Sequence, residues 1–294
     1  MARLWFPNDL GPAVNFAVRF AHKHETLVSV AVEYKARFRS LWLDDRGKNG
    51  PEHLGVPASV SHLAQGGFAE YSRLRTVNFE NGSALQELPA ACFRGSGLSE
   101  LHLPPGVIKL GYRSLAECRN LRFFSAEQGS TLTEIGPEAF RLSGLETLRL
   151  PDSVADIGEQ AFADCPNLEE LKFGANSRLR KLEDGAFKKC TALRLVNIPG
   201  RVTDLGEGCF RDCTALYQVK FDRRDETRPF PCRSLWIHSY AFSNTGLRYF
   251  QVPYYARQTG NGQFARCRKL DCIEFEPDPY GKGPIWDAAK MRSR

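Results

Sequence analysis

The chain has 294 residues, of which 42% are hydrophobic and 25% are charged, and its formal net charge is +6 at pH 7. This length exceeds that of a usual single domain, so the chain forms either two globular domains or one structure that grows by repetition. Its composition is typical of a globular protein, and no apolar run approaches the roughly 18–20 residues that cross a bilayer, so the sequence predicts no transmembrane segment.

Residues 1–40 form the first predicted unit. Their apolar stretch, AVNFAVRFAHKHETLVSVAVEYKARF, starts at Ala13 and is expected to fold as a helix and a strand. Because a repetitive structure must cover the apolar face of its first turn, we interpret this segment as an N-terminal cap, with an independent functional domain as the alternative. Pro7 and Pro12 interrupt the start of the chain, so a secretory signal is not supported, whereas an organelle transit peptide stays open.

Residues 41–276 form the second predicted unit, an array of repeats with a period of 22 to 25 residues apart from one interval of 32. The array is aligned on a recurring small residue followed by Phe. The nine positions of this Phe or its Leu substitute, called register positions below, are Phe68, Phe93, Leu115, Phe140, Phe162, Phe187, Phe210, Phe242 and Phe264. The clearest unit, LRLPDSVADIGEQAFADCPNLEELKF, starts at Leu148, and its apolar residues are expected to point inward.

The units share an L-x-x-L-x-L stretch whose last three residues alternate apolar, polar and apolar, as in Leu148, Arg149 and Leu150. This alternation predicts one short, half-buried strand per turn. Pro or Gly follows the stretch, as at Pro151 and Gly174, and ends the strand. A unit of this length cannot bury its own core, so neighbouring units must stack as a solenoid, and its parallel sheet would extend for roughly 40 Å.

The segment IGPEAFRLSGLETLRLPDSVADIGEQAFADC, from Ile135 to Cys165, carries an alternation between an A-F-x-x-C half and a shorter half with Ser-Gly-Leu. This pattern resembles the BspA-like class of leucine-rich repeats, and the resemblance covers about Leu54 to Phe275. It implies an α/β leucine-rich-repeat solenoid with one parallel strand per turn and about nine turns. It also implies a role in adhesion or protein interaction, often in surface proteins of bacteria and protists, with no catalytic residue in the repeat.

Two segments depart from the repeat. An insertion at residues 222–233, DRRDETRPFPCR, lengthens one interval and is predicted to loop out, either as a functional loop or as a solvated excursion. Residues 277–294 form a C-terminal tail that is rich in Pro and Gly and is expected to lie extended against a neighbouring segment or to be disordered.

No catalytic, cofactor-binding or metal site is predicted. The six histidines lie in no motif, and the spacings that create nucleophiles, phosphate cradles and zinc sites do not occur. We therefore expect no cofactor, no small-molecule substrate and no enzymatic activity.

The nine cysteines follow the repeat rather than a disulfide framework. Five lie three residues after a register position, two lie directly before one, and all seven are predicted to point inward as small apolar residues. These seven are Cys118, Cys165, Cys190, Cys213 and Cys267, then Cys92 and Cys209. An alternative is that Cys165, Cys190 and Cys213 stack closely enough to oxidise. The odd total of nine cysteines favours a reducing compartment, so we expect an intracellular location, cytoplasmic or within an organelle.

Charge is distributed unevenly along the array. Residues 59–172 carry 10 basic and 15 acidic side chains, whereas residues 173–294 carry 22 basic and 13 acidic side chains. A basic C-terminal half suits a complementary protein, an RNA or an anionic membrane surface, although solvated charge is the plainer interpretation.

The polar residue between the last two apolar positions of each strand must face away from the core. These residues form a ladder with one member per turn, and apolar or aromatic side chains lie beside it. The predicted partner-binding residues are Arg149, Lys172, Leu195, Lys220 and Tyr249, with Arg223 and Arg224 of the insertion. We predict a non-catalytic protein-interaction scaffold, an accessory or structural subunit of a larger assembly. An RNA-associated protein that uses the basic half and a surface adhesin are the alternatives.

Overall fold

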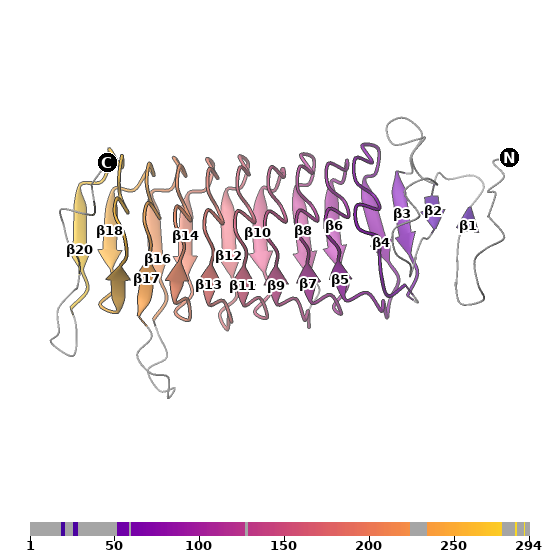
Figure 1. Cartoon of the computed structure of the whole chain (residues 1–294), viewed down its shortest axis with the longest axis horizontal. Helices are drawn as coiled ribbons and strands as arrows, with labels where there is room; N and C mark the ends of the chain where they lie inside the picture. The colour runs from indigo at the N-terminus through magenta and orange to yellow at the C-terminus, as the bar shows by residue number, and fades with distance from the viewer. Residues whose placement is uncertain are drawn as a thin grey trace.

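The computed structural model describes residues 19–20, 26–28, 52–58, 60–126, 129–223 and 234–277, together with Trp286 and Met291. Over these residues the chain winds into an elongated solenoid, with β3 (His53–Val56) near one end and β20 (Cys272–Phe275) at the other (Figure 1). Successive turns stack side by side, as the 22- to 25-residue period predicts. None of the described residues belongs to a helix long and apolar enough to cross a membrane.

One side of the solenoid carries the predicted strands. After β3 these are β4 (Thr76–Phe79), β6 (Glu100–Leu103), β8 (Phe123–Ala126), β10 (Thr147–Leu150), β12 (Glu170–Phe173), β14 (Leu195–Ile198), β16 (Gln218–Phe221), β18 (Tyr249–Val252) and β20. In β10, Leu148 and Leu150 are buried while Arg149 is exposed. The structure thus confirms the alternation that the sequence predicts, and its outward side is called the long-strand face below.

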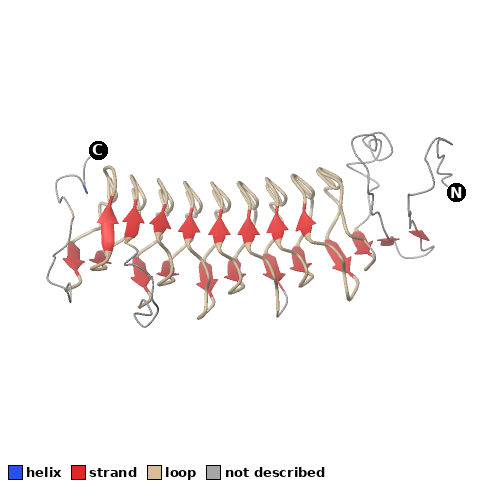
Figure 2. Cartoon of the chain, turned by 60° about the horizontal axis from the view of Figure 1, so that its bottom comes forward, coloured by secondary structure: helices blue, strands red, loops and turns tan. Residues whose placement is uncertain are grey.

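A second parallel sheet lies on another side, so the prediction of one strand per turn is wrong. Its eight strands are β5 (Glu87–Leu88), β7 (Lys109–Leu110), β9 (Glu134–Ile135), β11 (Asp156–Ile157), β13 (Lys181–Leu182), β15 (Asp204–Leu205), β17 (Leu235–Ile237) and β19 (Ala256–Gln258). Figure 2 separates the two rows of strands from the row of turns. Most of these strands contribute a single inward residue, such as Ile157 or Leu182, and two residues are too few for a visible alternation.

The third side consists of turns, and the α/β label is therefore also wrong, since the described residues form strands and turns where other repeat proteins place helices. Around Phe162, Gln160 and Asp164 have φ angles of 51° and 57°, which an α-helix cannot contain. The amide groups of Gln160, Phe162 and Asp164 donate to the next turn instead, to Asp184 O, Ala186 O and Lys188 O at 2.8–2.9 Å. The turn side is a third ladder of hydrogen bonds between repeats.

Register phenylalanines stack along the interior of this turn side. Phe162 lies between Phe140 and Phe187, with ring centroids 5.0 and 5.1 Å apart and nearly parallel planes. The stack continues through Phe210 to Phe242 at 5.5 and 5.6 Å, and all these side chains are fully buried. The repeat register predicted from the sequence is confirmed.

The shorter Ser-Gly-Leu half of the repeat has a steric cause. Gly144 follows Phe140 at a corner that is one residue shorter than the corner after Phe162. A Cβ at Gly144 would overlap the carbonyl oxygen of Arg119 in the preceding turn, so only glycine permits this close approach. Gly97 and Gly246 occupy the equivalent corners and meet the carbonyls of Ser72 and Thr214.

Further described residues contact the first and last turns of the solenoid. At the N-terminal end, β1 (Arg19–Phe20) pairs with β2 (Thr26–Val28), which pairs in turn with β3. The rest of residues 1–40 lies outside the described residues, so their role as a cap stays a prediction. At the C-terminal end, Met291 is buried and its carbonyl accepts a hydrogen bond from Phe264 N at 3.0 Å, while Trp286 Nε1 donates to Ala256 O at 3.3 Å. These two residues of the tail therefore pack against the last turn.

Candidate partner-binding face

Outward side chains on the long-strand face form two main columns, at the first and third positions of each strand. Register pairing aligns Arg149 with Lys172 and Leu195 with Gln218, so members of one column on paired strands are about one strand spacing apart, roughly 4.8 Å. The face thus presents one pair of side chains per turn at a regular distance.

Four of the predicted partner-binding residues lie on this face between β10 and β16. Arg149 is exposed and has no acidic partner among the described residues, whereas Lys172 Nζ pairs with Glu170 at 2.5 Å. Leu195 is half-exposed, and Lys220 is exposed beside Asn197 without an ion pair in the described part of the chain. Arg149 and Lys220 are therefore available to an external carboxylate or phosphate.

Tyr249 stands on β18, beyond a break in the sheet. β16 ends a six-stranded sheet and β18 begins a separate two-stranded one, so Tyr249 is not paired with the turn that carries Lys220. It is 39% exposed, and its hydroxyl donates to Glu274 Oε2 at 2.8 Å. This hydrogen bond to a carboxylate raises the pKa of the Tyr249 hydroxyl. The tyrosine is thereby held in place with its ring accessible.

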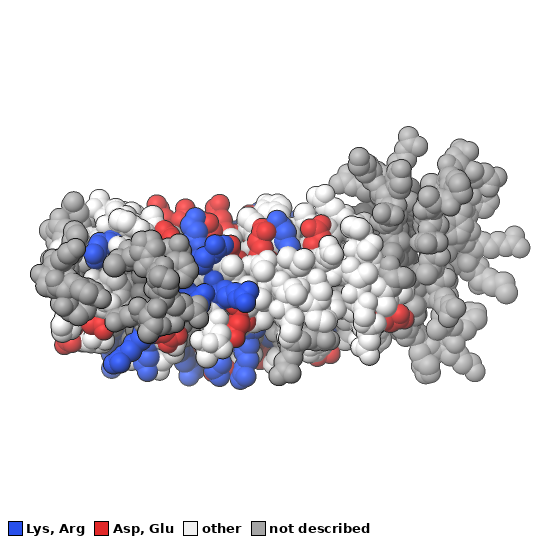
Figure 3. Space-filling view, turned by 90° about the horizontal axis from the view of Figure 1, so that it is seen from below, with Lys and Arg blue, Asp and Glu red and all other residues white. Residues whose placement is uncertain are grey.

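The structure describes only one of the two predicted arginines of the insertion. Arg223 is exposed directly after β16, while Arg224 lies outside the described residues. Figure 3 shows basic side chains gathered on the surface seen from below, in the C-terminal half. Arg178, Arg201 and Arg223 are exposed on the segments that leave β12, β14 and β16.

Other exposed aromatic side chains lie in places that the one-strand interpretation missed. Phe123 and Tyr217 are 51% and 49% exposed on or beside the long-strand face. Trp236, which is 42% exposed at the middle of β17, was not identified. Trp236 lies between the apolar residues Leu235 and Ile237, and this pattern indicates an outward side chain only once the second sheet is recognised.

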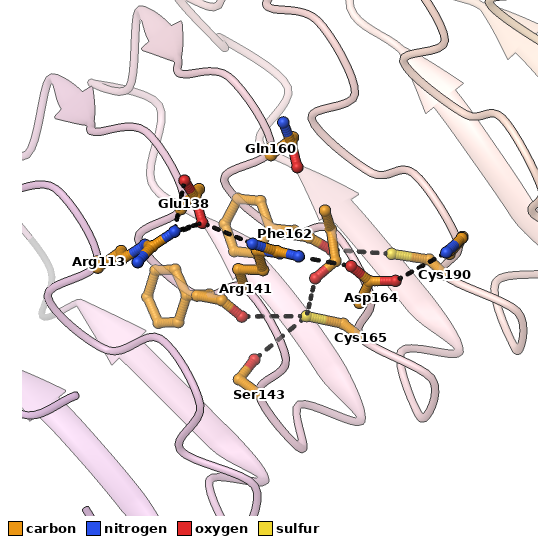
Figure 4. A network of polar contacts seen from close by, with 12 residues as sticks. Arg113, Glu138, Arg141, Ser143, Gln160, Phe162, Asp164, Cys165 and Cys190 are labelled. Carbon is orange, nitrogen blue, oxygen red and sulfur yellow. Dashed lines mark hydrogen bonds and ion pairs between the residues drawn. The ribbon is translucent and has the colours of Figure 1, made fainter. Parts of the chain in front are cut away.

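The turn face carries a network of charges that are paired with one another (Figure 4). Arg113 and Arg141 both contact Glu138, at 2.8 and 2.9 Å, and Arg141 also contacts Asp164 at 3.4 Å. Lys189 extends this network through an ion pair with Asp164 at 3.7 Å. Partial burial opposes ionisation of Glu138, but hydrogen bonds from the two arginines outweigh it and lower its pKa. This network links consecutive repeats.

A second series of contacts, made by the cysteines, lies in the interior of the same turns. Cys165 Sγ donates to Phe140 O at 3.2 Å and Cys190 Sγ to Phe162 O at 3.1 Å (Figure 4). In the next turn, Cys213 Sγ donates to Phe187 O at 3.1 Å. Burial raises the pKa of Cys213 to about 12, so this thiol stays protonated at neutral pH.

The inward prediction for the seven repeat cysteines is confirmed for six of them, while Cys267 is half-buried. All eight cysteines in the described part of the chain are free thiols, so the stacked Cys165, Cys190 and Cys213 form no disulfide with one another. The ranges that the structure describes contain no group of three or more Cys, His, Asp or Glu placed to hold a metal ion. The cysteine positions therefore serve packing and hydrogen bonding within the corners.

Comparison with known proteins agrees with this geometry. The family model "BspA type Leucine rich repeat region" matches residues 51–169, 133–228 and 229–279, with six copies. No curated protein gives a significant match.

Two solved structures resemble the chain. The pneumococcal vaccine antigen PcpA is 20% identical with a TM-score of 0.50, and the alignment covers 76% of this chain and 62% of the antigen. The T. pallidum leucine-rich repeat protein TpLRR is 18% identical with a TM-score of 0.50, and the alignment covers 87% of each chain. This chain thus spans less than two thirds of the pneumococcal antigen, and at these identities the likeness concerns the fold.

Proposed function

Because the chain belongs to the family of BspA-type leucine-rich repeat proteins, we propose that it is a non-catalytic scaffold that binds another protein through its long-strand face. It acts as an accessory or structural subunit of a larger assembly. The observation that carries this proposal is that Arg149 and Lys220 on the long-strand face have no acidic partner among the described residues, on a face that also presents the exposed rings of Phe123 and Tyr249. Exposed aromatic and Arg side chains are frequent anchors of protein interfaces.

RNA binding is the second candidate, and the basic side chains of the C-terminal half favour it. Contacts to several phosphates would make affinity fall steeply with salt concentration, whereas a protein partner held by Leu195 and Tyr249 would depend on salt weakly. A surface adhesin is the third candidate, since one structural neighbour is described as a vaccine antigen. Adhesion would require export, and the free buried thiols support our proposal of an intracellular location, cytoplasmic or within an organelle.

The test combines recovery of a partner with surface variants. The full chain, tagged at one end, is purified at moderate salt, and the affinity of the co-purified partner is measured with the isolated components. A variant with Arg149→Glu and Lys172→Glu should weaken binding by more than about 1 kcal/mol, because both residues lie on the long-strand face.

The matched control carries Arg119→Glu and Arg268→Glu. Both residues are exposed at equivalent corners, four residues after a register position and away from the long-strand face, and the change in net charge is the same. Equal loss of affinity in both variants would point to a general charge effect and would contradict the proposal.

A further inference from the structure

The corners of the solenoid, which join each register position to the leucine before the next long strand, differ in length. Gly97, Gly144 and Gly246 each mark a corner that is one residue shorter than the corner of the turn before it and of the turn after it. A short corner between two longer ones is set back from them. Each of these three places is therefore a position where the surface can be hollowed between turns.

Two of the short corners are closed by an arginine of the preceding turn. Arg75 Nη1 donates to Gly97 O at 3.1 Å, and it lies 3.2 Å from the place that a Cβ on Gly97 would take. At the corner of Gly144, the equivalent residue is Arg122, whose guanidinium pairs with Glu146 of the short turn itself. Both corners thus use their arginine for a contact within the molecule.

The third short corner, at Gly246, lacks both contacts. Tyr217 takes the position of the closing arginine, and Arg248 takes the position that Glu146 has in the second corner. On the following turn, Lys269 takes a position that is occupied by asparagine after each of the other two short corners. The ion pair is therefore absent here, and two cations stand in its surroundings.

A hollow of about 260 Å³ lies at this third corner. It is lined by Thr214, Ala215, Tyr217, Gly246, Arg248 and Lys269. The two turns touch behind it, since a Cβ on Gly246 would lie 2.5 Å from Thr214 O. The volume is below the roughly 300–1,000 Å³ of sites for drug-sized molecules, so the hollow suits a single chemical group.

The charges around the hollow favour an anionic group. Its lining contains two cations and no acidic residue, and neither Arg248 nor Lys269 has an acidic partner among the described residues. Asp271 is exposed on the same turn as Lys269, but it does not line the hollow and pairs with neither cation. Arg266 and Arg268 are exposed at the corner of that turn, so the local balance stays positive.

A phosphate monoester matches this lining better than a carboxylate or a phosphodiester. It carries up to about two negative charges at pH 7, equal to the number of cations, whereas the other two groups carry one each. Its three free oxygens are acceptors for Arg248, Lys269 and the hydroxyl of Thr214. The exposed ring of Tyr217 adds apolar surface beside the cations, which suits a phosphate carried on a side chain.

From this comparison of the three corners we infer that the hollow at Gly246 binds a phosphorylated side chain of another protein. Arg248 and Lys269 contact the phosphate, and Tyr217 packs against the rest of the side chain. The inference goes beyond the proposed function and does not require it, because these two cations are not the ones assigned to the partner on the long-strand face.

The test uses the full chain and fluorescein-labelled nonapeptides of Gly and Ala that carry one central phosphoserine or one central phosphotyrosine. Binding is followed by fluorescence anisotropy at physiological salt. At least one of the two peptides should bind at least about tenfold more tightly than its unphosphorylated form. Its affinity should fall as pH is lowered below about 6, where the monoester takes up its second proton.

Variants locate the site. Arg248→Gln with Lys269→Gln should lower the affinity for the phosphorylated peptide at least about tenfold, because both charged donors are lost. Arg149→Gln with Lys172→Gln is the matched control, since it removes the same charge from exposed residues of the long-strand face. The control should change the affinity less than about twofold.

A second variant closes the hollow without removing any of its backbone. Tyr217→Arg with Arg248→Glu rebuilds the ion pair that Arg122 and Glu146 form at the second corner, and it should abolish detectable binding of the phosphorylated peptide. Tyr217 and Arg248 are both exposed, so the thermal midpoint should stay close to that of the parent.

Four outcomes would overturn the inference. These are equal binding of the phosphorylated and unphosphorylated peptides, equal losses in the hollow and control variants, competition by inorganic phosphate at the same concentration as the phosphopeptides, and tighter binding of an oligouridylate. The proposed function is judged separately, by whether Arg149→Glu with Lys172→Glu weakens the co-purified partner. If that variant weakens the partner while neither phosphopeptide binds, the assignment of the hollow is wrong and the scaffold function stands.

Discussion

The turn face and the long-strand face use the same period in opposite ways. On the turn face, charges of opposite sign alternate from one repeat to the next, so Glu138 and Asp164 are each contacted by two basic residues. On the long-strand face, Arg149 stands beside Lys172, a like charge, and Lys220 stands beside Asn197. The network on the turn face pairs its charges within the molecule, whereas Arg149 and Lys220 on the long-strand face have no acidic partner among the described residues.

This difference separates stability from recognition. An ion-pair network that joins repeats adds to the stacking that holds a solenoid together, whereas like charges held side by side weaken it slightly. A face that retains such charges together with exposed aromatic rings is better explained by a partner than by folding.

The largest expected effect comes from the interior, which both faces share. Phe162→Ala should lower the free energy of unfolding by about 3–5 kcal/mol, because it empties a space between two stacked rings. Phe123→Ala, at a side chain that is 51% exposed, should change it by less than about 0.5 kcal/mol. Urea unfolding of both variants measures the difference, and equal stabilities would show that the repeat register is wrong.

A smaller effect is expected at the short corners. Gly144→Ala should destabilise the protein by about 1–3 kcal/mol, since the added methyl group overlaps the carbonyl of Arg119. Gly106→Ala is the matched control, because its Cβ would meet its nearest neighbour at an ordinary 3.4 Å. Thermal unfolding should separate the two, and a Gly144→Ala midpoint as high as that of the control would contradict the steric account.

Substitutions on the long-strand face test whether its exposed side chains bind the partner. Tyr249→Ala combined with Lys220→Glu should weaken binding of the partner by more than about 1 kcal/mol, because both side chains are exposed on the long-strand face. Neither side chain is buried, so the unfolding midpoint should stay close to that of the parent. Calorimetric titration with the co-purified partner provides the affinity, and unchanged affinity in the folded variant rejects these residues as anchors.

The turn-face network should show its contribution as a dependence of stability on pH. The pKa of Glu138 is lower in the folded protein than in the unfolded chain, so its stabilisation is present above the unfolded value and is lost as pH falls through the folded value. Glu138→Gln should therefore cost roughly 0.5–1 kcal/mol at neutral pH, and the deficit should shrink in acid. A deficit that stays constant down to acid would mean that packing, and not charge, accounts for it.

The sequence was sufficient for features that repeat many times. Phe162 and its equivalents recur often enough to establish the register, and the alternation in β10 identifies Arg149 as outward. The second sheet was not predicted because strands such as β13 span only two residues. The sequence also did not predict that turns replace helices in the described repeats. These turns depend on positive φ angles at residues such as Gln160 and Asp164, where no glycine marks the conformation.

The break between β16 and β18 shows a different limit. The insertion at residues 222–233 was visible as a long interval, but an insertion alone does not open a sheet, since β15 and β17 pair across it. The opening depends on Asp222 being held by Asn197 and on the close approach at Gly200, which are contacts between turns. Such contacts have no local signature in the sequence, so the break could not be predicted.

Lysine footprinting tests most directly whether the long-strand face is the one that binds. Lys172 and Lys220 are exposed on that face, and Lys189 is exposed on the turn face, where it provides a control within the same molecule. The protein is acetylated briefly, with and without the co-purified partner, and the modification of each lysine is measured by mass spectrometry. Protection of Lys172 and Lys220 with unchanged labelling of Lys189 is the predicted result. Protection of Lys189 alone would contradict the account.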